Sequence, residues 1–234
     1  MAEFYVSESM LARSFWMDLR ATTRAAEAIS DTYMIFEHAD KISKSFSNPT
    51  GSISRASCEL IWLISRYFEP KHIAEVGTFI GRSTLSLQRG AKDTLISLAT
   101  CDFSYDMWQA PDADAKAKIR YFGKTPSQRM FQQLISEGQK IDLFLIDGRI
   151  GQDDLDLITQ LKTNSSVFIL DDFEGTEKGV MNAVIMRERF KDLMLIAPEY
   201  DLNKGWNDAH CLAVLVPHSI FRITRQQRLP LGLM

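Results

Sequence analysis

The chain has 234 residues, of which 45% are hydrophobic and 24% charged. This length and composition fit one large α/β domain, with or without a helical extension, and exclude a disordered chain, a collagen-like fibre and a coiled-coil rod. A net charge of -3 argues against general nucleic-acid binding, which needs many basic residues to displace counterions from phosphates. Cys58, Cys101 and Cys211 lie far apart, so neither a disulfide framework nor a zinc site is expected.

Residues 1–5 have neither the basic nor the apolar region of a signal peptide. No stretch of the sequence approaches the roughly 18 uncharged apolar residues that a membrane span needs. We therefore expect a cytoplasmic protein that has no contact with a membrane.

Residues 7–47 contain neither proline nor glycine, and apolar residues such as Leu11, Phe15 and Leu19 recur at helical spacing. This pattern predicts one or two helices, followed by another over residues 54–67. We assign residues 1–50 to an N-terminal helical extension, whose amphipathic helices pack on a core or, less favourably, act as a lid or as a homodimer contact. Residues 51–234 then form the main domain.

From residue 72 onward, short apolar runs alternate with helical patterns. The predicted strands are 72–76, 94–101, 119–122, 141–146, 166–170, 193–197 and 211–216. The predicted helices between the first six strands are 82–89, 112–118, 127–137, 153–161 and 180–190. This alternation predicts an α/β fold with a seven-stranded, mostly parallel sheet that has helices on both faces. The stretch between the last two strands has no useful helix pattern, which favours an antiparallel last strand.

The turn after the first predicted strand has an acid-x-Gly-x-x-x-Gly pattern that runs from Glu75 to Gly81. A phosphate-binding P-loop has four residues between its glycines and a lysine after them, whereas here three residues follow Gly77 and Arg82 replaces the lysine. A dinucleotide-binding turn needs a glycine where Phe79 stands. The turn therefore suits a nucleoside ligand that carries no phosphate.

This motif resembles that of the class I S-adenosylmethionine-dependent methyltransferases, which implies a Rossmann-like fold with S-adenosylmethionine as the cofactor. The resemblance implies that Glu75 orients the ammonium of the cofactor and that Ser83 binds its methionine carboxylate near a helix N-terminus. It also implies that Gly77 and Gly81 allow a close approach of the backbone and that Thr78 belongs to the same cofactor-binding loop. Residues 51–234 would then be the methyltransferase domain.

Further cofactor contacts are expected after the second and third predicted strands. Asp102 ends the second strand, where a carboxylate can accept hydrogen bonds from both ribose hydroxyls. Phe103 could then lie against the adenine. Ser127 begins the helix after the third strand, where the family commonly binds adenine, but a serine there also fits a plain helix N-cap.

Three acids, Asp147, Asp171 and Asp172, follow the fourth and fifth predicted strands. Neighbouring parallel strands place them at one edge of the sheet, where their repulsion calls for a cation, hydrogen bonds or raised pKa values. The arrangement resembles the catechol O-methyltransferase-like branch, which includes small bacterial O-methyltransferases, and it implies that all three acids bind Mg²⁺. In the other interpretation Asp147 lies near the cofactor ammonium, while Asp171 and Asp172 cap a helix or bind substrate. That branch also has a lysine base where this chain has Ile150.

We therefore expect a methyltransferase that moves a methyl group to an oxygen, or less favourably to a nitrogen, of a small-molecule acceptor. Asp147 and Asp172 are the candidate catalytic residues, which take the proton from the acceptor directly or through a metal. One alternative is a catalytically inactive module that binds the cofactor. Another is an NAD-dependent dehydrogenase, which Phe79 disfavours.

Overall fold

The computed structural model describes residues 15–16, 19, 25–43, 53–91, 96–108, 117–173, 178–198 and 211–219. The helices in these ranges are α2 (Ala25–Ser43), α3 (Arg55–Phe68), α4 (Arg82–Gly90), α5 (Ser127–Ser136), α6 (Gln152–Leu161) and α7 (Gly179–Arg189). The strands are β1 (His72–Val76), β2 (Ile96–Asp102), β3 (Ala117–Gly123), β4 (Ile141–Ile146), β5 (Lys162–Leu170), β6 (Leu193–Ile196) and β7 (Ala213–Pro217). None of the described helices has both the length and the hydropathy that a membrane span requires.

The strands form one seven-stranded sheet in the order β3-β2-β1-β4-β5-β7-β6. All neighbours from β3 to β5 are parallel, whereas β7 runs antiparallel to both β5 and β6. This topology confirms the predicted Rossmann-like α/β fold, including its antiparallel last strand. The strand order reverses between β1 and β4, because the chain first moves outward to β2 and β3 and then returns to the other side of β1. Sheets of this kind bind ligands beyond the carboxyl ends of the strands at that reversal.

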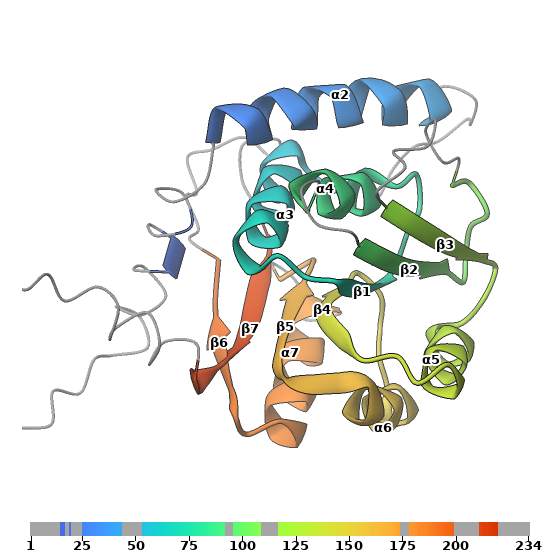
Figure 1. The fold of residues 1–234 in the computed structure, drawn as a ribbon, viewed down its shortest axis with the longest axis vertical. Coiled ribbons are helices and arrows are strands. Elements are labelled where there is room, and N and C mark those ends of the chain that lie inside the picture. The colour runs from blue at the N-terminus through green and yellow to red at the C-terminus, as the bar shows by residue number, and fades with distance from the viewer. Residues whose placement is uncertain are drawn as a thin grey trace, which may run out of the picture.

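Alternate residues of the central strands pack on opposite faces of the sheet. In β4, Leu143 and Leu145 belong to one hydrophobic core, while Phe144 and Ile146 belong to the other. Helices α2, α3 and α4 contribute to the first core, and α5, α6 and α7 contribute to the second (Figure 1). Because helices cover both faces, β4 is apolar along most of its length, as expected of a strand buried on both sides.

Residues near the N-terminus pack against the first core. Trp16 is fully buried, and its indole nitrogen donates a hydrogen bond of 3.0 Å to the main-chain oxygen of Ala197. On α2, Ala28 is buried, and Asp31 accepts a hydrogen bond of 2.9 Å from the indole of Trp62 on α3. These contacts attach α2 to a helix that itself packs on the sheet. A domain boundary at residue 50 stays a prediction.

The predicted strands 72–76 and 141–146 coincide with β1 and β4. The predicted helix 112–118 is wrong at its end, because Ala117 and Lys118 belong to β3, and its other residues lie outside the described ranges. Strand β5 begins at Lys162 rather than at the predicted residue 166. Its first residues are polar and at least partly exposed, so the apolar pattern used for prediction could not reveal them.

Candidate functional site

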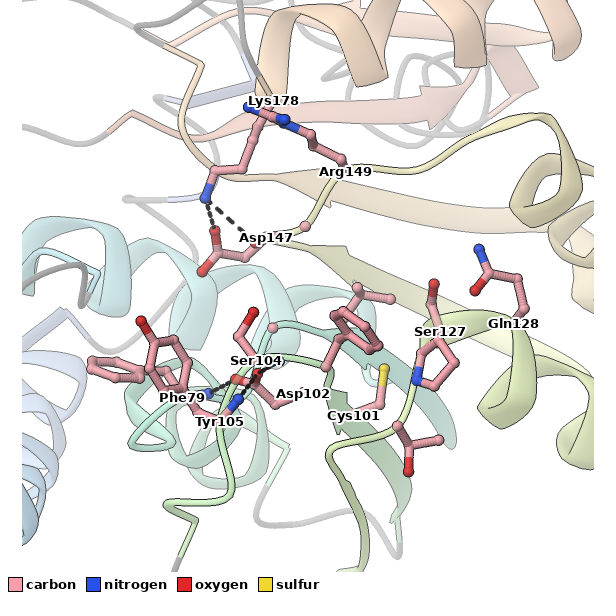
Figure 2. A pocket seen from close by; sticks show the side chains of 16 residues that line it. Phe79, Cys101, Asp102, Ser104, Tyr105, Ser127, Gln128, Asp147, Arg149 and Lys178 are labelled. Carbon is pink, nitrogen blue, oxygen red and sulfur yellow. Dashed lines mark hydrogen bonds and ion pairs between the residues drawn. The ribbon is translucent and has the colours of Figure 1, made fainter.

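A cleft of about 770 Å³ lies at the carboxyl ends of β1, β2 and β4, a size typical of small-molecule sites. Its lining residues are Val76, Gly77, Phe79, Cys101, Asp102, Phe103, Ser104, Tyr105, Thr125, Pro126, Ser127, Gln128, Asp147, Gly148, Arg149 and Lys178. The predicted cofactor-binding residues among them are Gly77, Asp102, Phe103, Ser127 and Asp147. Figure 2 shows Asp102 on one side of the cleft and Asp147 with Lys178 on the other.

The remaining predicted cofactor-binding residues do not line this cleft. Glu75 is fully buried, and its carboxylate accepts hydrogen bonds from the hydroxyls of Ser83, at 2.6 Å, and Thr84, at 2.5 Å. Burial raises the pKa of Glu75, while the two hydroxyls oppose the rise. Thr78 is also buried, and its hydroxyl lies 2.5 Å from that of Thr100. The bonds from Ser83 and Thr84 to Glu75 therefore join β1 to the first turn of α4 behind the cleft.

Two glycines allow close approaches within the turn from β1 to α4. Gly77 has a φ of 100°, and a β-carbon there would lie 3.0 Å from the main-chain oxygen of Asp147. Gly81 has a φ of 82°, and a β-carbon there would collide with the indole ring of Trp108. Both positions therefore favour glycine for its backbone conformation and for its lack of a side chain. At Gly81 the group that lies closest is the indole of Trp108, which belongs to this same chain.

Asp102 organises the loop that follows β2. Its Oδ1 accepts hydrogen bonds from the amides of Ser104, at 2.9 Å, and Tyr105, at 2.8 Å, and its Oδ2 accepts one from the amide of Phe79, at 2.8 Å. A carboxylate has about four lone-pair positions, so Oδ2 can accept one further hydrogen bond. The neighbouring Phe103 is 72% exposed and lines the same cleft. This loop therefore presents both an acceptor and an aromatic ring to a ligand.

The start of α5 forms one wall of the cleft, and hydrogen bonds to Asp154 hold it in place. The hydroxyl of Ser127 donates to its Oδ1 at 2.6 Å, and the side-chain amide of Gln128 donates to its Oδ2 at 2.8 Å. Asp154 is buried and also accepts a hydrogen bond of 2.9 Å from the amide of Gly151. The N-cap of α5 is Pro126, so the N-cap interpretation of Ser127 is wrong. A contact between Ser127 and adenine stays a prediction.

Three carboxylates and one ammonium meet where β4 and β5 end. We call Asp147, Asp171 and Asp172 the carboxylate cluster, because one oxygen from each lies within 4.8 Å of the other two. Lys178, the N-cap residue of α7, places its Nζ 2.8 Å from Oδ1 of Asp147, as Figure 2 shows. The same Nζ forms an ion pair with Oδ2 of Asp172. Asp172 is therefore paired with the lysine and does not occupy the N-cap position of α7.

Burial and mutual charge shift the pKa values of this group. Burial raises the pKa of Asp147 to about 7, although Lys178 opposes the rise. Burial, with the charges of Asp147 and Asp172, raises the pKa of Asp171 well above its usual value. Burial lowers the pKa of Lys178, but its two carboxylate partners outweigh that effect and raise it. The repulsion expected from the sequence is therefore relieved by a built-in cation, and it contributes to the raised pKa values of Asp147 and Asp171.

The carboxylate cluster contains the predicted Mg²⁺ ligands. The spacing of the three oxygens suits a single divalent ion, and carboxylates are preferred ligands of Mg²⁺. However, the ammonium of Lys178 contacts two of the three carboxylates, so an ion held by all three would lie beside a positive charge. With this lysine in place, the cluster does not fit a divalent ion.

Lys178 is the site residue that the sequence analysis missed. The lysine expected shortly after Asp147 is replaced by Ile150, which is buried. Lys178 approaches the same carboxylate from the start of α7 instead. A signal for it did exist, because a cation at a helix N-terminus opposes the helix dipole and so points to an acidic partner nearby. Only the fold shows that this partner is the carboxylate cluster.

The thiol of Cys101 borders the cleft, yet it is expected to be unreactive. Burial raises the pKa values of Cys101 and Cys58 to about 12, so both thiols stay protonated near neutral pH. In a Cys211→Ser variant at pH 8, Ellman's reagent should label neither thiol until the protein is unfolded, when both should react. Rapid labelling of one thiol in the native variant would contradict this prediction.

No protein-family model matches this sequence, and no curated protein matches it either. Solved structures, by contrast, share its fold. An O-methyltransferase from Bacillus cereus in complex with SAH has 14% identity and a TM-score of 0.56, over 79% of this chain and 90% of that chain. The O-methyltransferase TomG from Streptomyces achromogenes, in complex with SAM, has 16% identity and a TM-score of 0.54, over 82% of this chain and 89% of that chain.

A third structure, the SAH-bound methyltransferase PaMTH1 from Podospora anserina, has 14% identity and a TM-score of 0.54. The match covers 93% of this chain and 99% of that chain, so it extends over nearly the whole length of both. At such low sequence identity, these matches show only that the folds are alike. The chain has the Rossmann-like fold that these solved methyltransferases share.

Proposed function

We propose that this chain is an S-adenosylmethionine-dependent methyltransferase that transfers a methyl group to an oxygen of a small molecule. The observation that carries the proposal is the pair of polar groups on opposite sides of one cleft. Asp102 faces the cleft after β2, and Asp147 with Lys178 faces it after β4 and before α7. The fold shared with methyltransferases crystallised with SAM or SAH supports the same cofactor.

The Asp102 side of the cleft suits the nucleoside part of S-adenosylmethionine. The remaining acceptor position on Oδ2 of Asp102 can receive a ribose hydroxyl. The exposed ring of Phe103 offers a surface for the adenine, and Ser127 lies in the adjoining wall. Gly77 lets the backbone pass close to Asp147, so the floor of the cleft carries no side chain at that point. We assign the buried Glu75, Thr78, Gly81 and Ser83 to holding the shape of this turn.

The Asp147 side suits the acceptor. S-adenosylmethionine supplies a methyl group on a positively charged sulfur, and an acceptor oxygen displaces that sulfur in line. The acceptor must lose its hydroxyl proton as the O–CH3 bond forms and the S–CH3 bond breaks, leaving a neutral thioether. Asp147 can take this proton near neutral pH, because burial raises its pKa to about 7. Lys178 donates a hydrogen bond to the acceptor oxygen, and Asp172 holds Lys178 in position.

Calorimetry tests the cofactor assignment. Wild-type protein should bind S-adenosylmethionine and not NAD, and Asp102→Ala should weaken that binding by about 10- to 100-fold, because hydrogen bonds to a charged group are lost. Asp106→Ala, which removes an exposed acid from the same loop, should leave the affinity almost unchanged. Binding of NAD in place of S-adenosylmethionine would contradict the proposal.

A modified ligand separates ribose binding from loop structure, because Asp102 also accepts three main-chain amides. For an S-adenosylhomocysteine analogue without the ribose hydroxyls, Asp102→Ala should cost much less affinity than it costs for S-adenosylhomocysteine itself. An equal loss for both ligands would mean that Asp102 acts only through the loop. A screen of phenols, catechols, carboxylates and amines for methyl transfer would then identify the acceptor and exclude an inactive binding module.

Other predictions from the sequence stay proposals at this stage. They are an extension over residues 1–50 acting as a lid or homodimer contact, a methyltransferase domain over residues 51–234, a cytoplasmic location and no general nucleic-acid binding. The acceptor is proposed to be a small molecule, because the cleft has the volume of a small-molecule site.

A further inference from the structure

The position of Lys178 sets this site apart from a carboxylate metal centre. Its Nζ lies 2.8 Å from Oδ1 of Asp147 and pairs with Oδ2 of Asp172. It thus bridges the ends of β4 and β5, where the carboxylate cluster would otherwise share one bound cation.

The backbone at the start of α7 is closely packed, which places this lysine. A β-carbon on Gly179 would collide with the main chain of Asp171 and Asp172. The first turn of α7 therefore packs closely against the residues that follow β5. As a result, the backbone of Lys178 lies directly beside the carboxylate cluster. The side chain is 30% exposed, so it is partly buried in this position.

Electrostatics makes the ammonium and a divalent ion mutually exclusive here. An ion bound to Asp147 and Asp172 would be only a few ångströms from Nζ, and like charges at that distance repel strongly in a partly buried site. We infer that Lys178 takes the place of a divalent metal ion between the strand-end carboxylates, so that the proposed methyl transfer at this site needs no metal.

The replacement of a metal ion by Lys178 has a consequence for the methyl acceptor. An ammonium has three donors, and Asp147 and Asp172 take two of them. A third contact, to the main-chain oxygen of Asp147, is long at 3.5 Å, so this donor can turn to a bound oxygen. A divalent ion can hold two neighbouring oxygens of a substrate, whereas this lysine has one donor to offer. The expected acceptor is therefore anchored through a single hydroxyl.

Mn²⁺ binding to the full chain tests the inference without cofactor or acceptor. Free Mn²⁺ would be followed by electron paramagnetic resonance for the wild type, Lys178→Met, Lys178→Gln and the double variant Lys178→Met/Asp147→Asn. Removing the ammonium should tighten Mn²⁺ binding at least about tenfold in both single variants. The double variant should lose that gain in Mn²⁺ affinity, because it lacks the Asp147 carboxylate that would bind the ion. Thermal melting would verify that each variant is folded.

Two results of the Mn²⁺ measurements would overturn the inference. One is Mn²⁺ binding by the wild type that disappears in Asp147→Asn, because the lysine would then not exclude the ion. The other is folded Lys178→Met and Lys178→Gln proteins that gain no affinity for Mn²⁺. The inference rests on the proposed methyltransferase site. The Mn²⁺ measurements, however, need no methyl transfer, so a failure of the inference can be distinguished from a failure of the proposed function. If an acceptor is found, a chelator should leave the wild-type rate unchanged, and loss of activity restored by Mg²⁺ would also overturn it.

Discussion

Asp147→Asn is expected to lower kcat for methyl transfer by on the order of 100- to 10,000-fold, the range typical for loss of a general base. The amide cannot take the proton of the acceptor hydroxyl, and it also removes one of the two carboxylates that hold the ammonium of Lys178. The rate would be measured as formation of S-adenosylhomocysteine with an acceptor found in the screen.

Separate binding measurements show whether the effect of Asp147→Asn is on the chemical step. Affinity for S-adenosylmethionine, measured by calorimetry, should change far less than kcat, because the main proposed cofactor contact is Asp102, on the other side of the cleft. Asp153→Asn is a matched control, because it makes the same change at an exposed position in the first turn of α6. If Asp147→Asn kept more than about a tenth of the wild-type kcat, Asp147 would not be the base.

Phe144→Ala is expected to destabilise the protein by about 3–5 kcal/mol, the range for truncation of a buried phenylalanine. Phe144 is fully buried at the centre of the sheet. Its ring stacks on that of Phe168 at 4.7 Å between centroids and meets the edge of Phe131 at 6.4 Å. Removing it loses apolar burial and leaves a cavity that β4 and β5, held by their ladder of hydrogen bonds, cannot close.

Urea denaturation measures the free energy of unfolding for Phe144→Ala, and a thermal melt should show a fall in Tm on the order of 10 °C. Phe103→Ala is the matched control, because it makes the same chemical change at a side chain that is 72% exposed. It should alter stability by no more than about 0.5 kcal/mol. Equal losses for the two variants would contradict the burial of Phe144 in a packed core.

The sheet itself was largely predictable, because its central strands carry a strong local signal. Strand β4 is buried on both faces, and its apolar run at 143–146 marks a strand whatever its neighbours are. The turn from Glu75 to Gly81 was likewise recognisable, because it needs two glycines at positive φ. The pattern failed where strand residues are at least partly exposed, as at the polar start of β5 and at Lys118 of β3.

The site was only partly predictable from sequence. That Asp147, Asp171 and Asp172 gather at one edge follows from the rule that parallel strands end together, and the structure places them so. Glu75 and Ser83 were expected to face a ligand, but in the structure they bond to each other behind the cleft. A hydrogen bond between a strand residue and the first turn of the next helix depends on how the two elements pack, which no spacing rule reveals.

By itself, the sequence determined the alternation of strands and helices, the glycine turn after β1 and the acids at the ends of β4 and β5. These features are local, since each depends on the apolar pattern or on the backbone preference of a few adjacent residues. Only the tertiary structure decided that β7 inserts between β5 and β6 and that Lys178 meets Asp147 and Asp172. Both depend on contacts between residues far apart in the chain, and such contacts are set by the packing of whole elements.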